Sequence, residues 1–172
     1  MRKMTLLISC LSMGFCIFAE NVANIVKNGE FNEKKDNGMP VGWVNKTGRP
    51  DQYVIENEGE NNFLKMKSDK NESIFLLQTD VPLEKGKTYH VSCRVKSDTE
   101  SKYIFYIEWI NTAKKSFSLS SRNSTIKQAS KDWREIEFEF EYPESSKGPY
   151  LALNLQGPGE ICFDDIEIIE KN

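Results

Sequence analysis

The segment Tyr103–Ile110, which reads YIFYIEWI, is apolar or aromatic at every position except Glu108. If this segment is a β-strand, one of its faces carries only apolar and aromatic residues, and the other carries Tyr106 and Glu108. We expect the wholly apolar set to face the core, so that Tyr106 and Glu108 point outward. A phenol ring beside a carboxylate can bind a sugar, because sugars present flat CH faces and hydroxyl groups.

Further polar side chains join this outward face if the neighbouring strands belong to the same sheet. The leucines of segment 151–156 alternate with two amides, and the apolar residues of segment 88–96 alternate with a histidine and an arginine. The expected carbohydrate-binding face therefore comprises Tyr106, Glu108, Asn154, Gln156, Arg94 and His90. The opposite assignment of faces would expose Trp109, a larger aromatic platform, and an ordinary polar sheet face is the alternative to both.

A second set of oxygen-bearing side chains is suited to a cation. Glu30 and Asn32 flank Phe31 near the start of the chain, and Asp164 and Asp165 are adjacent near its end. Adjacent carboxylates repel one another, and a bound cation would relieve that repulsion. The four side chains can meet only if the first and last strands lie together; otherwise the two aspartates are solvated acids at the end of a loop.

Strands rather than helices must position these side chains, because period-two alternation dominates the chain and helical periodicity is scarce. The strand-like segments are Phe63–Lys67, Ser73–Thr79, Thr88–Lys96, Tyr103–Ile110, Phe117–Leu119, Trp133–Tyr142, Leu151–Gln156 and Ile161–Ile169. The segment Pro143–Pro149 is expected to be a loop. About seven to nine short strands separated by turns predict an all-β fold, an antiparallel β-sandwich or jelly roll. Phe31, Trp43 and Trp133 are expected in its core.

The first nineteen residues have the pattern of a secretory signal peptide. Two basic residues precede the apolar run Met4–Phe18, and Ala19 stands before the first polar stretch. The run is too short for a spanning helix, and Leu7–Cys10 is only a weak lipoprotein cleavage box. We therefore predict a signal peptide at 1–19 and one domain at 20–172, secreted, periplasmic or at the cell surface, with no membrane span.

The net charge and the cysteine content of the chain limit the classes of function that it can have. Removal of the signal peptide leaves 21 basic and 26 acidic residues, a net charge of −5, which argues against nucleic acid as a partner. The two cysteines that remain, Cys93 and Cys162, lie in apolar segments and can be buried thiols or one disulfide. The sequence contains no nucleophile-elbow motif and no pair of carboxylates in an apolar setting, so we expect a non-catalytic protein. We also expect this protein to be a monomer.

A set of short motifs, in this order, resembles the CenC-type carbohydrate-binding modules of the galactose-binding-like jelly-roll group. The motifs are Asn28-x-x-Phe31, Gly38-x-Pro40-x-x-Trp43, Leu77-Gln78, Val81-Pro82-Leu83, Gly86-Lys87-Thr88-Tyr89, Asp132-Trp133, Phe138-Glu139-Phe140 and Phe163-Asp164-Asp165-Ile166. Together they cover about residues 24–170. The resemblance implies a galactose-binding-domain-like β-sandwich whose ends meet at a structural calcium and whose concave sheet binds a polysaccharide.

The family usually opens Asn-x-Gly-Phe-Glu, and this chain departs from it at two positions. Glu30 replaces the glycine, and Asn32 replaces the acid that follows the aromatic residue. The expected calcium ligands are Asp165, Asp164, Asn32 and Glu30, with a lower affinity than usual because one charge is lost.

The sequence therefore favours an exported, non-catalytic module that binds a polysaccharide or oligosaccharide. Two other functions fit the same pattern. One is a structural or adhesion β-sandwich that contacts protein and has no sugar site, and the other is an accessory module of a glycoside hydrolase system. The accessory role is weakened because the chain carries no catalytic partner domain.

Overall fold

The computed structural model describes residues 23–113, the backbone of 116–119, and residues 127–171. The predicted signal peptide lies outside the described residues. Eleven strands and one short 3-10 helix make up the described part. In chain order they are β1 Val44–Thr47, η1 Pro50–Gln52, β2 Tyr53–Glu58, β3 Asn61–Ser68, β4 Ser73–Thr79, β5 Thr88–Lys96, β6 Lys102–Asn111, β7 Ser116–Leu119, β8 Lys127–Gln128, β9 Arg134–Glu141, β10 Ser146–Gln156 and β11 Gly159–Glu170.

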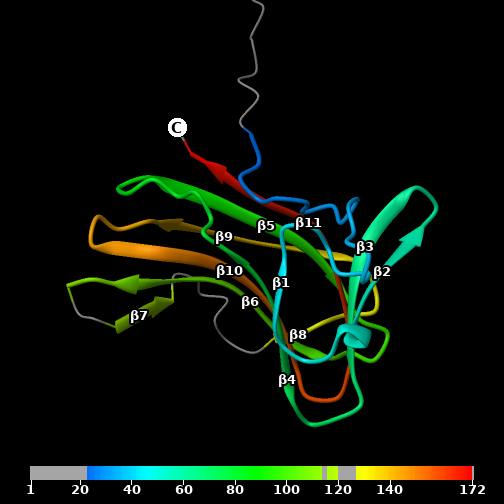
Figure 1. Ribbon diagram of the computed structural model, residues 1–172. Helices are drawn as coiled ribbons and strands as arrows, with labels where there is room; N and C mark the ends of the chain where they lie inside the picture. Colours follow the sequence, from blue (N-terminus) through cyan, green and yellow to red (C-terminus); the bar gives the residue numbers. More distant parts are fainter. Residues whose placement is uncertain (1–22, 114–115, 120–126, 172) are drawn as a thin grey trace, which may run out of the picture.

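These strands form two antiparallel sheets, which confirms the predicted β-sandwich. The six-stranded sheet has the order β1-β4-β10-β6-β7, with β8 paired to β6, and the five-stranded sheet has the order β2-β3-β11-β5-β9. Figure 1 shows them as two layers, with β5, β9 and β11 above β6, β7 and β10. In this view β6 and β10 bend downward towards the centre, so the outer face of the six-stranded sheet is its concave face.

The core lies between the sheets and is filled by the side chains that alternation assigned to it. Along β6 the wholly apolar set is buried, from Tyr103 to Trp109. Phe31 and Trp43 are buried as expected, at 1% and 0% exposure, and their ring centroids lie 5.7 Å apart. The two cysteines are buried free thiols, on strands β5 and β11.

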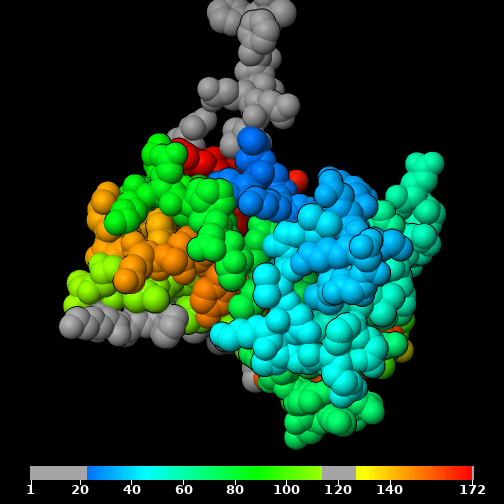
Figure 2. Space-filling model, in the orientation of Figure 1, coloured from blue at the N-terminus to red at the C-terminus, as the bar shows by residue number. Residues whose placement is uncertain are grey.

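The N-terminal segment is tied to the C-terminal strand β11. The amide of Ile25 donates to the carbonyl of Ile168 at 2.9 Å, and the Asn24 side chain donates to the carbonyl of Ile166 at 3.0 Å. Gly29 lies directly against Ile166, whose amide donates to the Gly29 carbonyl at 3.2 Å. Figures 1 and 2 show the blue N-terminal segment beside red β11, so the first and last parts of the domain lie together, as the cation hypothesis requires.

The predicted count of seven to nine strands was too low. Strands β1, β2 and β8 were missed, and the loop expected between Pro143 and Pro149 is largely the start of β10. In β1 most side chains are exposed, and the residues of β2 show no clean burial alternation, so neither strand has the period-two signal. Trp133 is also not a core residue, because it lies partly exposed on the outer face of the five-stranded sheet.

Candidate functional site: an aromatic platform on the six-stranded sheet

The outer face of the six-stranded sheet, which points away from the five-stranded sheet, carries the candidate site. In the register of β6 and β10, Tyr106 is opposite Ala152 and Glu108 is opposite Tyr150. On the other side of β10, Ala152 is opposite Leu77 of β4. Tyr106 and Glu108 therefore lie on the outer face, where the sequence analysis placed them.

Two tyrosines form the centre of this face. The ring centroids of Tyr106 and Tyr150 lie 6.4 Å apart, with the ring planes at 68°. The ammonium of Lys46 lies 5.9 Å from the centroid of the Tyr150 ring. A shallow hollow of about 140 Å³ is lined by Lys46, Thr47, Phe75, Leu77, Tyr106 and Tyr150.

This hollow is a platform rather than an enclosing pocket. Sites that enclose a small molecule usually have about 300–1,000 Å³, so a volume of about 140 Å³ cannot surround a sugar unit. Partly exposed aromatic rings on an open sheet can instead stack against one side of a long ligand. The geometry therefore suits an extended chain that lies across the strands.

Both phenols are hydrogen-bond donors at neutral pH. Burial, a hydrogen bond with Glu108 and the charge of this carboxylate all raise the pKa of Tyr150 far above its usual value. Burial is also the main cause that raises the pKa of Tyr106. The hydroxyls consequently keep their protons: the Tyr106 hydroxyl can donate to or accept from a sugar hydroxyl, and the Tyr150 hydroxyl, whose proton is directed at Glu108, can accept from one.

The two amides expected on this face serve the sheet itself. Asn154 lies on the outer side of β10 but is fully buried, and its amide donates to the carbonyl of Ile74 at 2.9 Å. Gln156 is partly exposed at the end of the face, donates to Asn154 and accepts a hydrogen bond from Ser73 at 3.1 Å. Their hydrogen-bonding groups are therefore already engaged with neighbouring strands.

His90 and Arg94 lie on the other side of the molecule, so the expectation of one shared face was wrong for them. Both belong to β5, which pairs with β9 and β11 in the five-stranded sheet and not with β6. The His90 ring lies 3.6 Å from a carboxylate oxygen of Glu137, and Arg94 lies 3.0 Å from one of Asp165. Period-two alternation gives the face of a strand but not the sheet to which it belongs.

Trp109 is a core residue, so the opposite assignment of faces for β6 is also wrong. The Trp109 side chain is only 4% exposed. Its ring stacks on Phe140 at 5.7 Å and meets Tyr142 edge-on at 5.6 Å. The ring is therefore not available to a ligand.

Tyr150, Phe75 and Lys46 are the site residues that sequence reasoning missed. Tyr150 directly follows a segment taken as a loop, and Lys46 belongs to a strand without alternation. Phe75 lies in a segment that was correctly predicted as a strand, Ser73–Thr79, and it alternates with Leu76 of the core. The outward parity of Phe75 was the one available signal.

Trp133 is the other large aromatic side chain on the surface, but two cations lie over its ring. The ammonium of Lys96 is 4.8 Å and the guanidinium of Arg94 is 5.1 Å from the ring centroid. Phe63 packs edge-on against the same ring at 5.6 Å. These contacts occupy the ring within the outer face of the five-stranded sheet, and they make it a poorer platform than Tyr106 and Tyr150.

At the candidate cation site, Asp164 has an unusual environment. Its side chain is fully buried, and one carboxylate oxygen accepts a hydrogen bond from Asn61 at 2.7 Å. The other oxygen, Oδ1, is buried and has no hydrogen-bond partner within the described residues. Burial is the main cause that raises the pKa of Asp164, and an unpartnered buried carboxylate oxygen is costly in free energy.

The other expected ligands are arranged less favourably. Asp165 pairs with Arg94, and the Asn32 amide donates to Glu30 at 2.8 Å and accepts from Asn62 at 2.9 Å. No group of three or more His, Cys, Asp or Glu residues in the described ranges could hold a metal ion. The residues present fit a cation only at Asp164, where amide and backbone oxygens would have to complete the shell.

Comparison of the chain with models of known protein families identifies its family. A family model described as "Carbohydrate binding domain" matches residues 23–160. The chain belongs to this family of carbohydrate-binding domains. The resemblance inferred from the sequence motifs is thereby confirmed.

Solved structures similar to this carbohydrate-binding domain share its fold. A "Family 16 Carbohydrate Binding Module-2" has a TM-score of 0.63 at 18% identity, over 86% of this chain and 100% of that chain. TmCBM61 "in complex with beta-1,4-galactotriose" has a TM-score of 0.62 at 14% identity, over 87% and 99%. The "CBM22-1 xylan-binding domain" from Paenibacillus barcinonensis Xyn10C has a TM-score of 0.61 at 13% identity, over 87% and 95%.

No curated protein matches this carbohydrate-binding domain. At identities of 13–18%, the structural likeness establishes the β-sandwich fold and not the ligand. Within its described residues, no helix has the length and apolar character that a membrane span requires.

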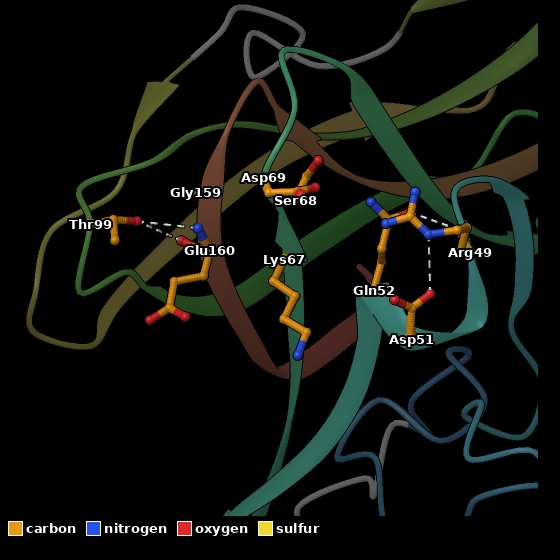
Figure 3. A pocket seen from close by; sticks show the side chains of 9 residues that line it. All are labelled: Arg49, Asp51, Gln52, Lys67, Ser68, Asp69, Thr99, Gly159 and Glu160. Atoms are coloured by element: carbon orange, nitrogen blue, oxygen red, sulfur yellow. Dashed lines mark hydrogen bonds and ion pairs between the residues drawn. The ribbon is translucent and has the colours of Figure 1, made fainter.

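A cavity larger than the hollow beside the tyrosines lies away from both candidate sites. It has a volume of about 410 Å³ and is lined by Arg49, Asp51, Gln52, Lys67, Ser68, Asp69, Thr99, Gly159 and Glu160. Figure 3 shows that these side chains come from η1, from the ends of β3 and β11 and from nearby loops, and that Arg49 faces Asp51, at 3.3 Å. None of the lining residues is aromatic, so the cavity offers no surface on which a sugar ring could stack.

Proposed function

We propose that this carbohydrate-binding domain is an exported, non-catalytic module that binds a polysaccharide or oligosaccharide on the outer face of its six-stranded sheet. The observation that carries the proposal is the pair of partly exposed tyrosines, Tyr106 and Tyr150, on an open sheet. Neighbours of the same fold are named for xylan and for beta-1,4-galactotriose, both chains of sugars.

In this mechanism the sugar chain lies over the two phenol rings. The CH face of one sugar unit stacks on an aromatic ring, which removes apolar surface from water. The phenol hydroxyls then exchange hydrogen bonds with sugar hydroxyls and fix the register of the chain. Glu108 holds the Tyr150 hydroxyl in place through the hydrogen bond between them.

The test of this function is a glycan array followed by titration of the best ligand against point variants. Tyr150→Ala and Tyr106→Ala should each lower the affinity about tenfold, because each removes one stacking surface. Tyr150→Phe keeps the ring and should lose less.

Trp133→Ala is the matched control, since it removes an aromatic side chain from the opposite sheet and should leave affinity unchanged. Equal losses in Trp133→Ala and the tyrosine variants would contradict this site. If no glycan on the array binds the folded domain, the structural or adhesion role becomes the better reading.

We further propose that a calcium ion binds at Asp164 and joins the ends of the domain. Calcium prefers oxygen ligands, with carboxylates, amides and backbone carbonyls combined. The buried Oδ1 of Asp164 provides an oxygen without a partner in the described part of the chain. Asn61 and Asn62 link Asp164 and Asn32 to the start of β3, so these groups share one region.

Thermal unfolding tests the calcium proposal. A ligand that binds only the native state raises the melting temperature, so calcium should raise it relative to buffer with chelator. Asp164→Asn should abolish that difference, whereas Asp165→Asn, which breaks the pair with Arg94, should keep it. Identical melting curves of the native domain with calcium and with chelator would refute the site.

A further inference from the structure

The charges on the outer face of the six-stranded sheet are opposite in sign to the charge of the whole chain. Among the strand residues whose side chains are described, this face carries Lys46, Lys102 and Lys147 but only one acid, Glu108. The complete chain has a net charge of −3. Three cationic side chains therefore lie on the same face as the two tyrosines.

The opposite face of the sandwich has the reverse character. Strand β9 alone carries four outward acids there, and these are Glu135, Glu137, Glu139 and Glu141. Lys65, Arg94 and Lys96 of that sheet are each paired with an acid, Lys65 with Glu56 at 2.8 Å. By contrast, Lys46, Lys102 and Lys147 form no ion pair with any residue of the described ranges, so their charges remain available to a ligand.

Building on the function proposed above, we propose that the ligand of this face is an acidic polysaccharide. Its apolar sugar faces lie on Tyr106 and Tyr150, and its carboxylate or sulfate groups lie near the three lysines. The single acid on this face, Glu108, is outnumbered by the three lysines, so the described strand residues keep a net positive charge there.

The spacing of the lysines requires a chain rather than a single sugar. Lys102 is opposite Gln156 at one end of the register between β6 and β10, and Lys147 is opposite Ile110 near the other end. The eight residue-to-residue steps from Lys102 to Ile110 span about 27 Å at 3.3–3.4 Å per residue. Lys46 lies between these ends, over the ring of Tyr150. Only an extended, repeatedly charged ligand can reach all three ammonium groups.

Binding to matched polymers tests this inference. The probes are polygalacturonate, the same polymer with its carboxylates methyl-esterified, a sulfated galactan and a neutral galactan, each titrated at low salt and at 0.5 M NaCl. We expect the acidic probes to bind at least about tenfold more tightly than the neutral ones at low salt, and high salt to remove most of this difference. Preference for polygalacturonate over the sulfated galactan, or the reverse, identifies the anionic group.

The variant K102Q/K147Q should lose about tenfold in affinity for the acidic probe and keep its affinity for neutral glycans, because neither lysine lines the hollow beside the tyrosines. The variant K70Q/K85Q is the matched control, because it makes the same charge change at exposed lysines elsewhere and should bind normally. Neutral polymers that bind through the tyrosines as tightly as acidic ones would overturn the acidic ligand and leave the proposed function intact. Failure of all four polymers, with binding of another glycan on the array, would overturn the acidic ligand alone, and failure of the polymers and of the whole array would overturn both.

Discussion

Replacement of Trp43 by Ala is expected to lower the free energy of unfolding by about 3–5 kcal/mol, the usual range for removing a large buried aromatic side chain. Trp43 is fully buried, and its ring packs against Phe31. Its indole nitrogen also donates to the carbonyl of Asn28 at 3.4 Å, so the ring secures the segment that runs along β11. The loss should therefore combine a cavity with a loosened N-terminal segment. Urea unfolding followed by circular dichroism measures it.

Two variants bracket the Trp43 result. Trp43→Phe retains an aromatic ring and should lose clearly less than the alanine variant. Val44→Ala, at the next position, removes a side chain that is 50% exposed and should change stability by no more than about 0.5 kcal/mol. A Trp43→Ala protein as stable as Val44→Ala would show that Trp43 does not anchor the core.

Replacement of Gly29 by Ala is expected to cost about 3 kcal/mol, although alanine usually stabilises a site by about 0.4–1 kcal/mol through the unfolded chain. A Cβ at position 29 would lie 2.1 Å from the carbonyl oxygen of Ile166. That neighbour is backbone and cannot rotate away, so the N-terminal segment must move off β11. The free-energy cost of the steric overlap exceeds the entropic stabilisation that alanine brings through the unfolded chain. The hydrogen bond from the Ile166 amide to the Gly29 carbonyl is lost as well.

Gly38→Ala separates crowding from backbone conformation. Gly38 has a φ of +81°, but a Cβ there meets no atom within 4 Å. Its replacement should cost only about 1–2 kcal/mol, for the left-handed conformation. Chemical unfolding of both variants compares the two effects, and a Gly29→Ala protein that unfolds at the wild-type urea concentration would contradict the close approach to Ile166.

The sequence was informative where one face of a strand is buried. Alternation placed Thr88–Lys96 and Ser73–Thr79 at their observed bounds, and it assigned the core faces of both β5 and β6 correctly. Strands β1 and β2 lie at sheet edges, where exposure weakens the alternating pattern. Edge strands therefore need the tertiary structure to be recognised.

The candidate site was only half predictable, because it depends on which strands are neighbours. Tyr106 and Glu108 follow from the parity of one strand. Tyr150 lies beside them because β10 pairs with β6. His90 lies on the other side of the molecule because β5 belongs to the five-stranded sheet and does not pair with β6. Such pairings link residues about 40 positions apart, and no local pattern in the chain encodes them.

The consecutive strands β10 and β11 belong to different sheets, and each is the central strand of its sheet. Strand β10 lies between β4 and β6, and β11 lies between β3 and β5. Both strands lie within residues 146–170, so neither sheet can close before this part of the chain has taken its place. Pairings of this kind between distant residues make folding slow. Assembly of both sheets consequently depends on one pair of consecutive strands, and a change that disturbs the turn between them should affect the two sheets together.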